Sequence, residues 1–240
     1  MRLVQALACG AAIALAIPAV RTLAQMDPDR VVPNGGITVS GWKGKIDASS
    51  IKQGRTINDS KFAPKGKDIE IAAGPAAVYW NPSNTASGDY TVKATFTEPQ
   101  YMSANSHPHP YGIFIGGTKM DTDQMTLLYC VPYGNGNVLV RGFNPTATGR
   151  GGNVTGVFTV QPPTANAAVK KAEKGASVVQ EVAWTVKGSR AECTINGAVV
   201  ASYDKGDLVG PGKLDSLDGV YGIRVSHNLD VVVSGLAVTK

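Results

Sequence analysis

Residues 193–203 read CTINGAVVASY, two runs rich in β-branched and small apolar residues on either side of an Asn-Gly pair. A type I′ turn needs positive φ at both central residues, and Asn-Gly is a dipeptide that adopts it readily. Asn196 and Gly197 therefore predict a tight antiparallel hairpin. The glycine- and asparagine-rich segment 134–137 (GNGN) predicts a second hairpin with a slightly longer loop.

On either side of these hairpins, runs in which apolar residues alternate with polar ones recur along the chain. No stretch after residue 25 sustains the apolar spacing of a helix. The strands that this pattern predicts span residues 37–42, 69–72, 77–80, 90–97, 111–116, 124–131, 138–143, 154–160, 178–186, 191–195, 198–203, 219–226 and 230–238. So many strands without a helix require two packed sheets or a barrel. We expect an all-β fold, a two-sheet antiparallel sandwich, in one domain over 25–240.

The N-terminus has the pattern of a secretory signal peptide, which we assign to residues 1–24. Arg2 precedes an apolar run over 3–20, and Thr22, Leu23 and Ala24 form the region in which a signal peptidase would cleave, near Ala24. An uncleaved membrane helix is the alternative, although the run is short for a span. We expect a secreted or periplasmic protein with no membrane span after cleavage.

The charge argues against nucleic acid as a partner. The formal charge is +5, and removing residues 1–24 leaves 21 bases against 18 acids. No block of like charges follows, so the pattern indicates a solvated surface. Residues 144–177 are rich in Gly, Pro, Thr, Asn and Ala and predict a long surface excursion, in which 165–174 could form a short helix or remain irregular.

Two cysteines remain after the signal peptide, Cys130 and Cys193, each within a predicted strand. In an oxidising compartment they could pair, but two buried free thiols are also compatible with the pattern. Neither has the spacing of a zinc site or lies beside a base, so a cysteine nucleophile is not expected.

The segment HPHPYGIFIGGTK (107–119) raises the question of a metal site. In an extended chain His107 and His109 point to the same side, and Asp121 or Asp123 could join them around an ion. We favour the alternative, a rigid entry to a buried strand in which proline holds the preceding residue extended and the imidazoles bond to loop backbone. No metal or other cofactor is therefore predicted.

A corner is predicted at SHNLD, where His227 has a structural role, capping backbone groups, and Asn228 adopts a left-handed conformation.

Three segments are similar to the concanavalin A-like lectin and glucanase superfamily, of laminin-G and jelly-roll type, and particularly to its secreted bacterial members. They are 107–117, the hairpin from 184–186 through 193–197, and 219–230. The resemblance implies two antiparallel sheets, one of them concave, with glycan binding as the commonest use. Glycanases of this superfamily carry acidic residues at alternating positions of one strand, and we find no such strand. Whether the protein is an enzyme stays open.

The resemblance implies that ligand would lie in a groove on the concave sheet, bordered by aromatic and polar side chains. Candidates for this lining are Tyr79, Trp80, Tyr101, Tyr111, Tyr129, Tyr133, Arg141 and Asn144. From these and the histidines we predict as ligand-binding residues His107, His109, Tyr111, Tyr129, Arg141 and Trp80. The predicted function is a secreted carbohydrate-binding β-sandwich, with a glycan or polysaccharide as partner. The alternative is a glycoside hydrolase-like enzyme of the same fold, with metal assistance through the His107 region.

Overall fold

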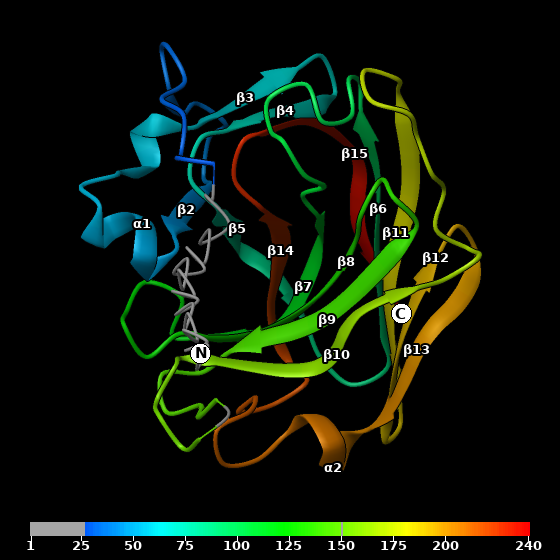
Figure 1. Cartoon of the computed structure of the whole chain (residues 1–240). Helices are drawn as coiled ribbons and strands as arrows, with labels where there is room; N and C mark the ends of the chain where they lie inside the picture. Colours follow the sequence, from blue (N-terminus) through cyan, green and yellow to red (C-terminus); the bar gives the residue numbers. More distant parts are fainter. Residues whose placement is uncertain (1–26, 150) are drawn as a thin grey trace, which may run out of the picture.

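The computed structural model describes residues 27–149 and 151–240, so the predicted signal peptide lies outside the described residues. Strands make up most of the described chain, and they form two sheets that pack face to face (Figure 1). The predicted all-β sandwich is thereby confirmed. In the described part of the chain, no helix combines the length and the apolar character needed to cross a membrane.

Sheet A has eight strands, which are antiparallel to their neighbours except for the parallel pair β1 and β3. In spatial order they are β1 (Gly36–Ile37), β3 (Lys61–Lys65), β4 (Asp68–Ala73), β15 (Leu229–Thr239), β6 (Tyr90–Glu98), β11 (Val178–Lys187), β12 (Arg190–Ile195) and β13 (Ala198–Asp204).

Sheet B has seven strands, all antiparallel to their neighbours. In spatial order they are β10 (Val157–Ala165), β9 (Asn137–Phe143), β8 (Thr126–Pro132), β7 (Tyr111–Thr118), β14 (Gly219–Val225), β5 (Ala77–Ala86) and β2 (Lys43–Ile46).

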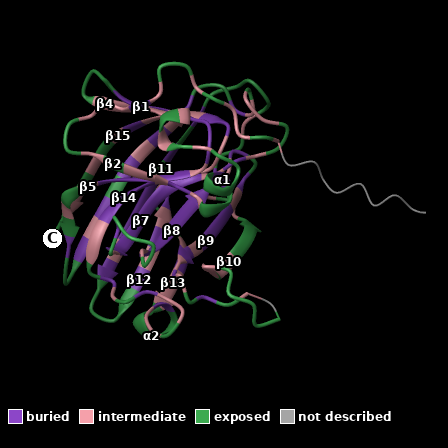
Figure 2. Ribbon diagram, turned by 90° about the vertical axis from the view of Figure 1, so that its left-hand side faces the viewer, coloured by how far each residue is buried: buried purple, intermediate pink, exposed green. Residues whose placement is uncertain are grey.

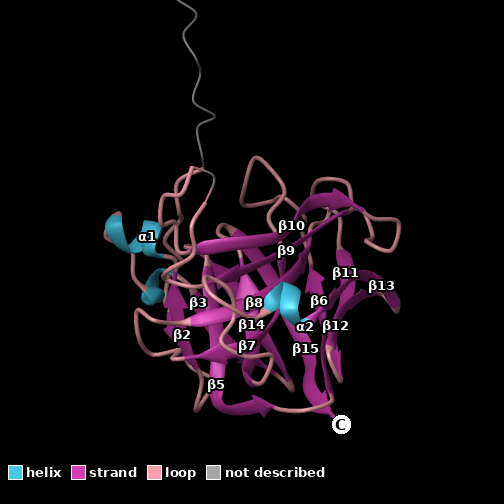
Figure 3. Ribbon diagram, turned by 90° about the horizontal axis from the view of Figure 1, so that it is seen from below, coloured by secondary structure: helices cyan, strands magenta, loops and turns pink. Residues whose placement is uncertain are grey.

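The helical elements of the described chain are short and lie outside the two sheets (Figure 3). They are α1 (Ala48–Lys52), the 3-10 turn η1 (Ile57–Asp59) and α2 (Lys205–Leu208). Of these, α1 follows β2 directly and lies beside it, where it can contribute to the rim of sheet B (Figure 1).

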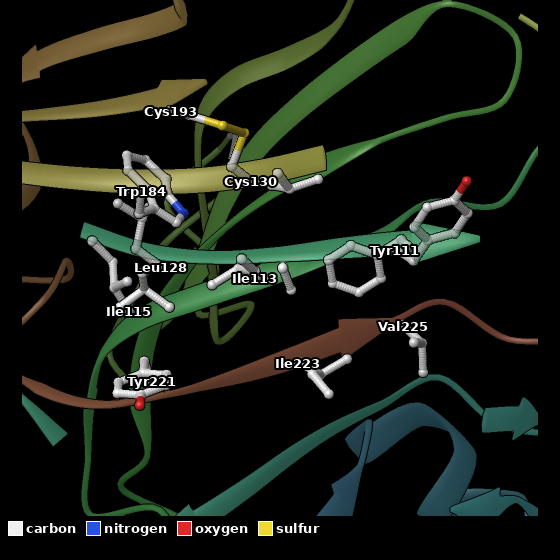
Figure 4. Close-up of a cluster of buried hydrophobic side chains, with 14 of the residues drawn as sticks. Tyr111, Ile113, Ile115, Leu128, Cys130, Trp184, Cys193, Tyr221, Ile223 and Val225 are labelled. Atoms are coloured by element: carbon white, nitrogen blue, oxygen red, sulfur yellow. A yellow bond between two sulfur atoms is a disulfide. The ribbon is translucent and has the colours of Figure 1, made fainter. Parts of the chain in front are cut away.

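The core lies between the two sheets, because alternate residues of each strand point to the same face. Figure 4 shows this for β7, where Tyr111, Ile113 and Ile115 enter one apolar layer with Trp184 of β11. In sheet B the central strands β7 and β8 are buried almost throughout, and exposed residues gather in loops and at strand ends (Figure 2).

Covalent and aromatic contacts join the sheets directly. Cys130 of β8 and Cys193 of β12 form a disulfide, which settles the choice between a bond and two free thiols (Figure 4). The ring of Phe62 in β3 stacks on Tyr79 of β5, with 4.5 Å between centroids.

The predicted turns are confirmed by the backbone. Asn196 and Gly197 have φ of 51° and 83°, as a type I′ turn requires, and they join β12 to β13. The segment 134–137 joins β8 to β9, and Asn228 has the predicted left-handed φ of 50°.

One prediction of local structure is wrong, one strand was missed, and the open choice over 165–174 is decided. The strand predicted over 37–42 is interrupted, because Gly41 adopts a φ of 76° in a turn and β2 begins only at Lys43. Strand β3 was not predicted, since Pro64 interrupts its pattern. No helix forms over 165–174: β10 runs to Ala165, with its two prolines tolerated because it is an edge strand.

Candidate functional site

The two sheets differ in what their outer faces carry. In β6 of sheet A, buried and more exposed residues alternate, so the outer face of that sheet meets solvent. In β8 of sheet B all seven residues are buried, which means that side chains cover both of its faces. A strand covered on both faces reads as a continuous apolar run, as TLLYCVP does. The outer face of sheet B is therefore partly enclosed.

A second hydrophobic cluster lies on this outer face, separate from the core between the sheets. Its buried members come from β5, β7, β8, β9 and the loop after β7, and they are Val78, Trp80, Phe114, Met120, Leu127, Tyr129, Val131 and Leu139. Met125, Tyr133, Phe143 and Val220 pack against them and are only partly buried. The outer face thus offers apolar surface that is still accessible at its margin.

The loop 119–125 between β7 and β8 is tied to the edge strand β2 by two ion pairs. Lys43 Nζ lies 2.9 Å from a carboxylate oxygen of Asp121, and Lys45 Nζ lies 3.1 Å from Asp123. Asp121 and Asp123 pair with lysines, and among the described residues the side chains close enough to share an ion with His107 and His109 do not include them. The sequence-based hypothesis that one of these aspartates joins the two histidines around an ion is wrong.

A cavity of about 420 Å³ opens on this side of the molecule, and we call it the outer-face groove. Strand β2, α1, the loop before β8 and the end of β9 surround it. Its lining residues are Lys45, Ile46, Asp47, Ala48, Ser49, Ile51, Asp123, Met125, Phe143, Pro145, Thr155, Gly156 and Val157. The groove therefore combines an aromatic ring and aliphatic side chains with a lysine, two carboxylates and two hydroxyls.

Arg224 of β14 connects the groove to the aromatic cluster. Its side chain is only 10% exposed, and its Nη2 donates to Asp47 Oδ2 at 2.7 Å while Nη1 donates to Oδ1. The guanidinium carbon lies 5.3 Å from the ring centroid of Tyr129 and 5.1 Å from that of Phe143, within cation-π range. Burial opposes the charge, but the Asp47 carboxylate outweighs it and raises the pKa of Arg224.

The aromatic hydroxyls on this face stay protonated. Burial raises the pKa of Tyr129 and of Tyr133, and the nearby cations Arg224 and Arg141 only partly offset this effect. The phenols therefore act as neutral hydrogen-bonding groups at ordinary pH.

The six predicted ligand residues fall into three different places. Trp80, Tyr129 and Arg141 lie on the outer face of sheet B, but Trp80 is only 3% exposed and Arg141 Nε donates to Thr159. Tyr111 points the other way, into the core with Ile113 and Ile115 of the same strand, whereas Phe114 faces outward. None of the six is among the described residues that line the groove.

His107 and His109 lie apart from the groove, in the loop before β7, where they meet His227. His109 Nδ1 donates to the carbonyl oxygen of His227, as expected for an imidazole bonded to loop backbone. Burial lowers the pKa of His109 to about 4, so this imidazole is neutral at physiological pH. The predicted capping of backbone by His227 is not what the described residues show: its Nδ1 lies 2.9 Å from a carboxylate oxygen, Asp29 Oδ1.

Sequence reasoning missed Arg224, Asp47 and Phe143. A signal for Arg224 was present, since it alternates with the core residues Ile223 and Val225 and must therefore face away from the core. Asp47 carried no such signal, because its role depends on a partner 177 residues away.

No family model and no curated protein sequence matches this chain. Among solved structures, the carbohydrate-binding module CBM66 from Bacillus subtilis is similar, with a TM-score of 0.51 at 9% identity, over 86% of this chain and 99% of that one. A protein of unknown function with a galectin-like fold, also from Bacillus subtilis, gives 0.48 at 12% identity, over 82% and 88%. Sheep galectin-11 gives 0.38 at 12% identity, over 65% and 92%. The chain thus has the β-sandwich fold of the first of these proteins.

Proposed function

We propose that this protein binds carbohydrate in the outer-face groove. The observation that carries the proposal is the pairing, in one cavity, of the half-buried Phe143 ring with fixed polar groups. Ligand sites are typically cavities of this size, lined mainly by apolar side chains with a few placed polar groups. The shared fold with a carbohydrate-binding module supports the same assignment.

The chemistry of the lining suits a sugar. A pyranose presents apolar C–H groups on its faces and hydroxyls at its edges, so it needs a flat apolar contact and surrounding donors and acceptors. Phe143, Met125 and Val157 supply the apolar contact. Lys45, Asp47 and Thr155 supply charged and hydroxyl groups, and Arg224 holds the Asp47 carboxylate in one orientation. Arg141 and Tyr129, on the same face, are the predicted residues that we retain as flanking groups.

Binding, rather than hydrolysis, fits the carboxylates of the groove. A glycosidase needs two carboxyl groups with separate roles, one as acid and one as base or nucleophile. Both carboxylates of the lining are engaged by bases, Asp47 by Arg224 and Asp123 by Lys45. We place the protein outside the cytoplasm, as a secreted or periplasmic glycan-binding protein, on the basis of the signal-peptide pattern in residues 1–24.

A glycan array followed by titration calorimetry with the best oligosaccharide tests this function. We expect saturable binding that Phe143→Ala weakens by about tenfold, which corresponds to about 1.4 kcal/mol. Val199→Ala, at an exposed apolar position on edge strand β13 of sheet A, is the matched control and should leave affinity unchanged.

Two results would overturn the proposal. One is the absence of binding to any glycan by a protein whose circular dichroism shows an intact fold. The other is release of reducing sugar from the bound oligosaccharide, which would favour the glycoside hydrolase-like alternative.

A further inference from the structure

The three histidines of the chain converge at one end of sheet B. Strands β7 and β14 are antiparallel neighbours, with Tyr111 opposite Val225. The residues that precede Tyr111 and those that follow Val225 therefore meet, and Ser226 N donates to Pro110 O at 2.9 Å. This pairing brings the His-Pro-His segment of one loop against the histidine of the next turn.

The imidazoles are in direct contact. One ring nitrogen from each of His107, His109 and His227 lies within 4.8 Å of the other two. His107 Nε2 and His109 Nε2 are 2.8 Å apart, and the rings of His109 and His227 stack with 4.1 Å between centroids. The sequence contains three histidines in all, so every imidazole of the protein is in this cluster.

The hydrogen bonds fix which ring nitrogen carries the proton in two of the imidazoles, and the bare Nε2 of His109 accepts a hydrogen bond from His107 Nε2. A carbonyl oxygen can only accept, so His109 Nδ1 must carry a proton and His109 Nε2 must be bare. A carboxylate likewise accepts, so His227 Nδ1 carries a proton, and in the neutral form of this imidazole Nε2 is the nitrogen with the lone pair. A neutral imidazole with a bare nitrogen is the form that ligates a metal.

A second layer of contacts holds these tautomers. Asp29 accepts from His227 Nδ1 and also from Ser50 Oγ at 2.6 Å, and Arg55 donates to its backbone carbonyl. Asp27 accepts from Ser106 N at 2.6 Å and lies 3.7 Å from His107 Nδ1. Histidines that ligate a metal usually donate their other N–H to a carboxylate or backbone carbonyl, as His227 and His109 do here.

We propose that His107, His109 and His227 form a binding site for a divalent first-row transition metal, zinc in particular. Three imidazole ligands suit zinc, which binds nitrogen at about 2.0–2.1 Å and leaves a fourth position for water or a ligand when the protein supplies three groups. His107, whose side chain is half exposed, places that fourth position toward solvent. Asp29 is the positioning residue for His227.

Metal binding requires small movements of the three histidine side chains. A tetrahedral ion at these bond lengths separates its nitrogens by about 3.3 Å, so His107 and His109 must move apart by about half an ångström. His107 must also carry its proton on Nδ1, toward Asp27, instead of on Nε2. The stacked rings of His109 and His227 must splay so that both lone pairs point at the ion.

The test uses the protein produced from its full sequence and purified without a histidine tag. Titration calorimetry with zinc chloride should show one equivalent bound with a micromolar or tighter dissociation constant. Cobalt chloride, added separately, should give the visible absorption of a four- or five-coordinate nitrogen site, which hexa-aqua cobalt lacks.

The variants identify the ligands. His107→Gln, at an exposed position, should lower zinc affinity at least about tenfold without loss of fold. Asp29→Asn should weaken it by about 10- to 100-fold, in the range observed for outer-shell partners of ligating histidines. Asp123→Asn removes a carboxylate that is ion-paired to Lys45, and it should leave affinity unchanged.

The proposal is overturned if zinc does not bind to the folded protein, or if binding persists unchanged in His107→Gln. A decrease that is equal in Asp123→Asn and Asp29→Asn would also overturn it, because it would show general attraction to surface carboxylates. This readout is independent of glycan binding, so the two proposals stand or fall separately.

Discussion

Arg224 and Asp47 form a two-point ion pair between β14 and the start of α1, across 177 residues of sequence. The pair closes one side of the outer-face groove and lies against the rings of Tyr129 and Phe143. Because Arg224 is nearly buried, its charge depends on this single carboxylate for compensation.

Replacing Asp47 by asparagine should therefore destabilise the fold strongly. Asp47→Asn keeps the side-chain shape but leaves a buried guanidinium without a counter-charge, and we expect a loss of about 3 kcal/mol in the free energy of unfolding. Urea denaturation at neutral pH measures this loss. Asp121→Asn, which removes the exposed partner of Lys43, is the control and should lower the free energy of unfolding by less than about 1 kcal/mol. Equal costs in the two variants would mean that water reaches Arg224.

Removing the disulfide should destabilise the sandwich, because the unfolded chain gains conformational entropy when the cross-link is lost. The bond between Cys130 and Cys193 closes a loop of 63 residues, for which loop-closure entropy predicts about 4 kcal/mol. We expect the double variant Cys130→Ala, Cys193→Ala to lose that amount of unfolding free energy in urea denaturation while retaining its circular dichroism spectrum. A loss below about 1 kcal/mol would contradict this expectation.

Glu98 should make stability decrease as pH rises. Its side chain is buried at the end of β6, one carboxylate oxygen has no hydrogen-bond partner among the described residues, and burial raises its pKa to about 7. A raised pKa means that the folded state holds the proton more tightly than the unfolded state. The stability that this provides is complete below about pH 4.5 and is lost as pH rises to about 7.

The variant Glu98→Gln isolates this effect. Its stability should match that of the wild type near pH 4 and exceed it by about 3 kcal/mol near pH 8, since each unit of pKa shift corresponds to about 1.4 kcal/mol. Urea unfolding of both proteins at several pH values gives the difference. A difference that does not change with pH would mean that Glu98 titrates normally.

Asn196 has two roles that substitution can separate. Its backbone adopts φ of 51° in the turn, and its amide donates to Ala168 O and Gln180 Oε1 at 2.8 and 2.7 Å. Asn196→Gly keeps the turn and removes the side-chain bonds, for which we expect a loss of about 1–2 kcal/mol. Asn196→Ala should cost about 1 kcal/mol more, because alanine disfavours positive φ.

Hydrogen exchange of the amides in 166–170 checks the same contacts. Both Asn196 variants should raise exchange in this segment, since Asn196 and Gln180 bond to its backbone. Unchanged exchange would show that the segment is held by other contacts.

The strands and turns of this fold could be predicted because their signals are local. Alternation of apolar residues and the Asn-Gly pair act over a few residues, and they placed most strands of both sheets correctly. Strand β3 was missed because Pro64 contradicts the local signal, while tertiary pairing with β4 and β1 holds the segment extended. Tyr111 was predicted in the groove because alternation does not tell which face of a strand is the inner one.

The sequence by itself thus determined the all-β class, the hairpins and the residues that alternate into a core. Only the tertiary structure decided which outer face is enclosed, that Arg224 meets Asp47, and that His227 joins His107 and His109. The physical reason is range: propensity and periodicity act between neighbours in the chain, whereas the groove and the histidine cluster arise where strand register brings distant segments within contact distance.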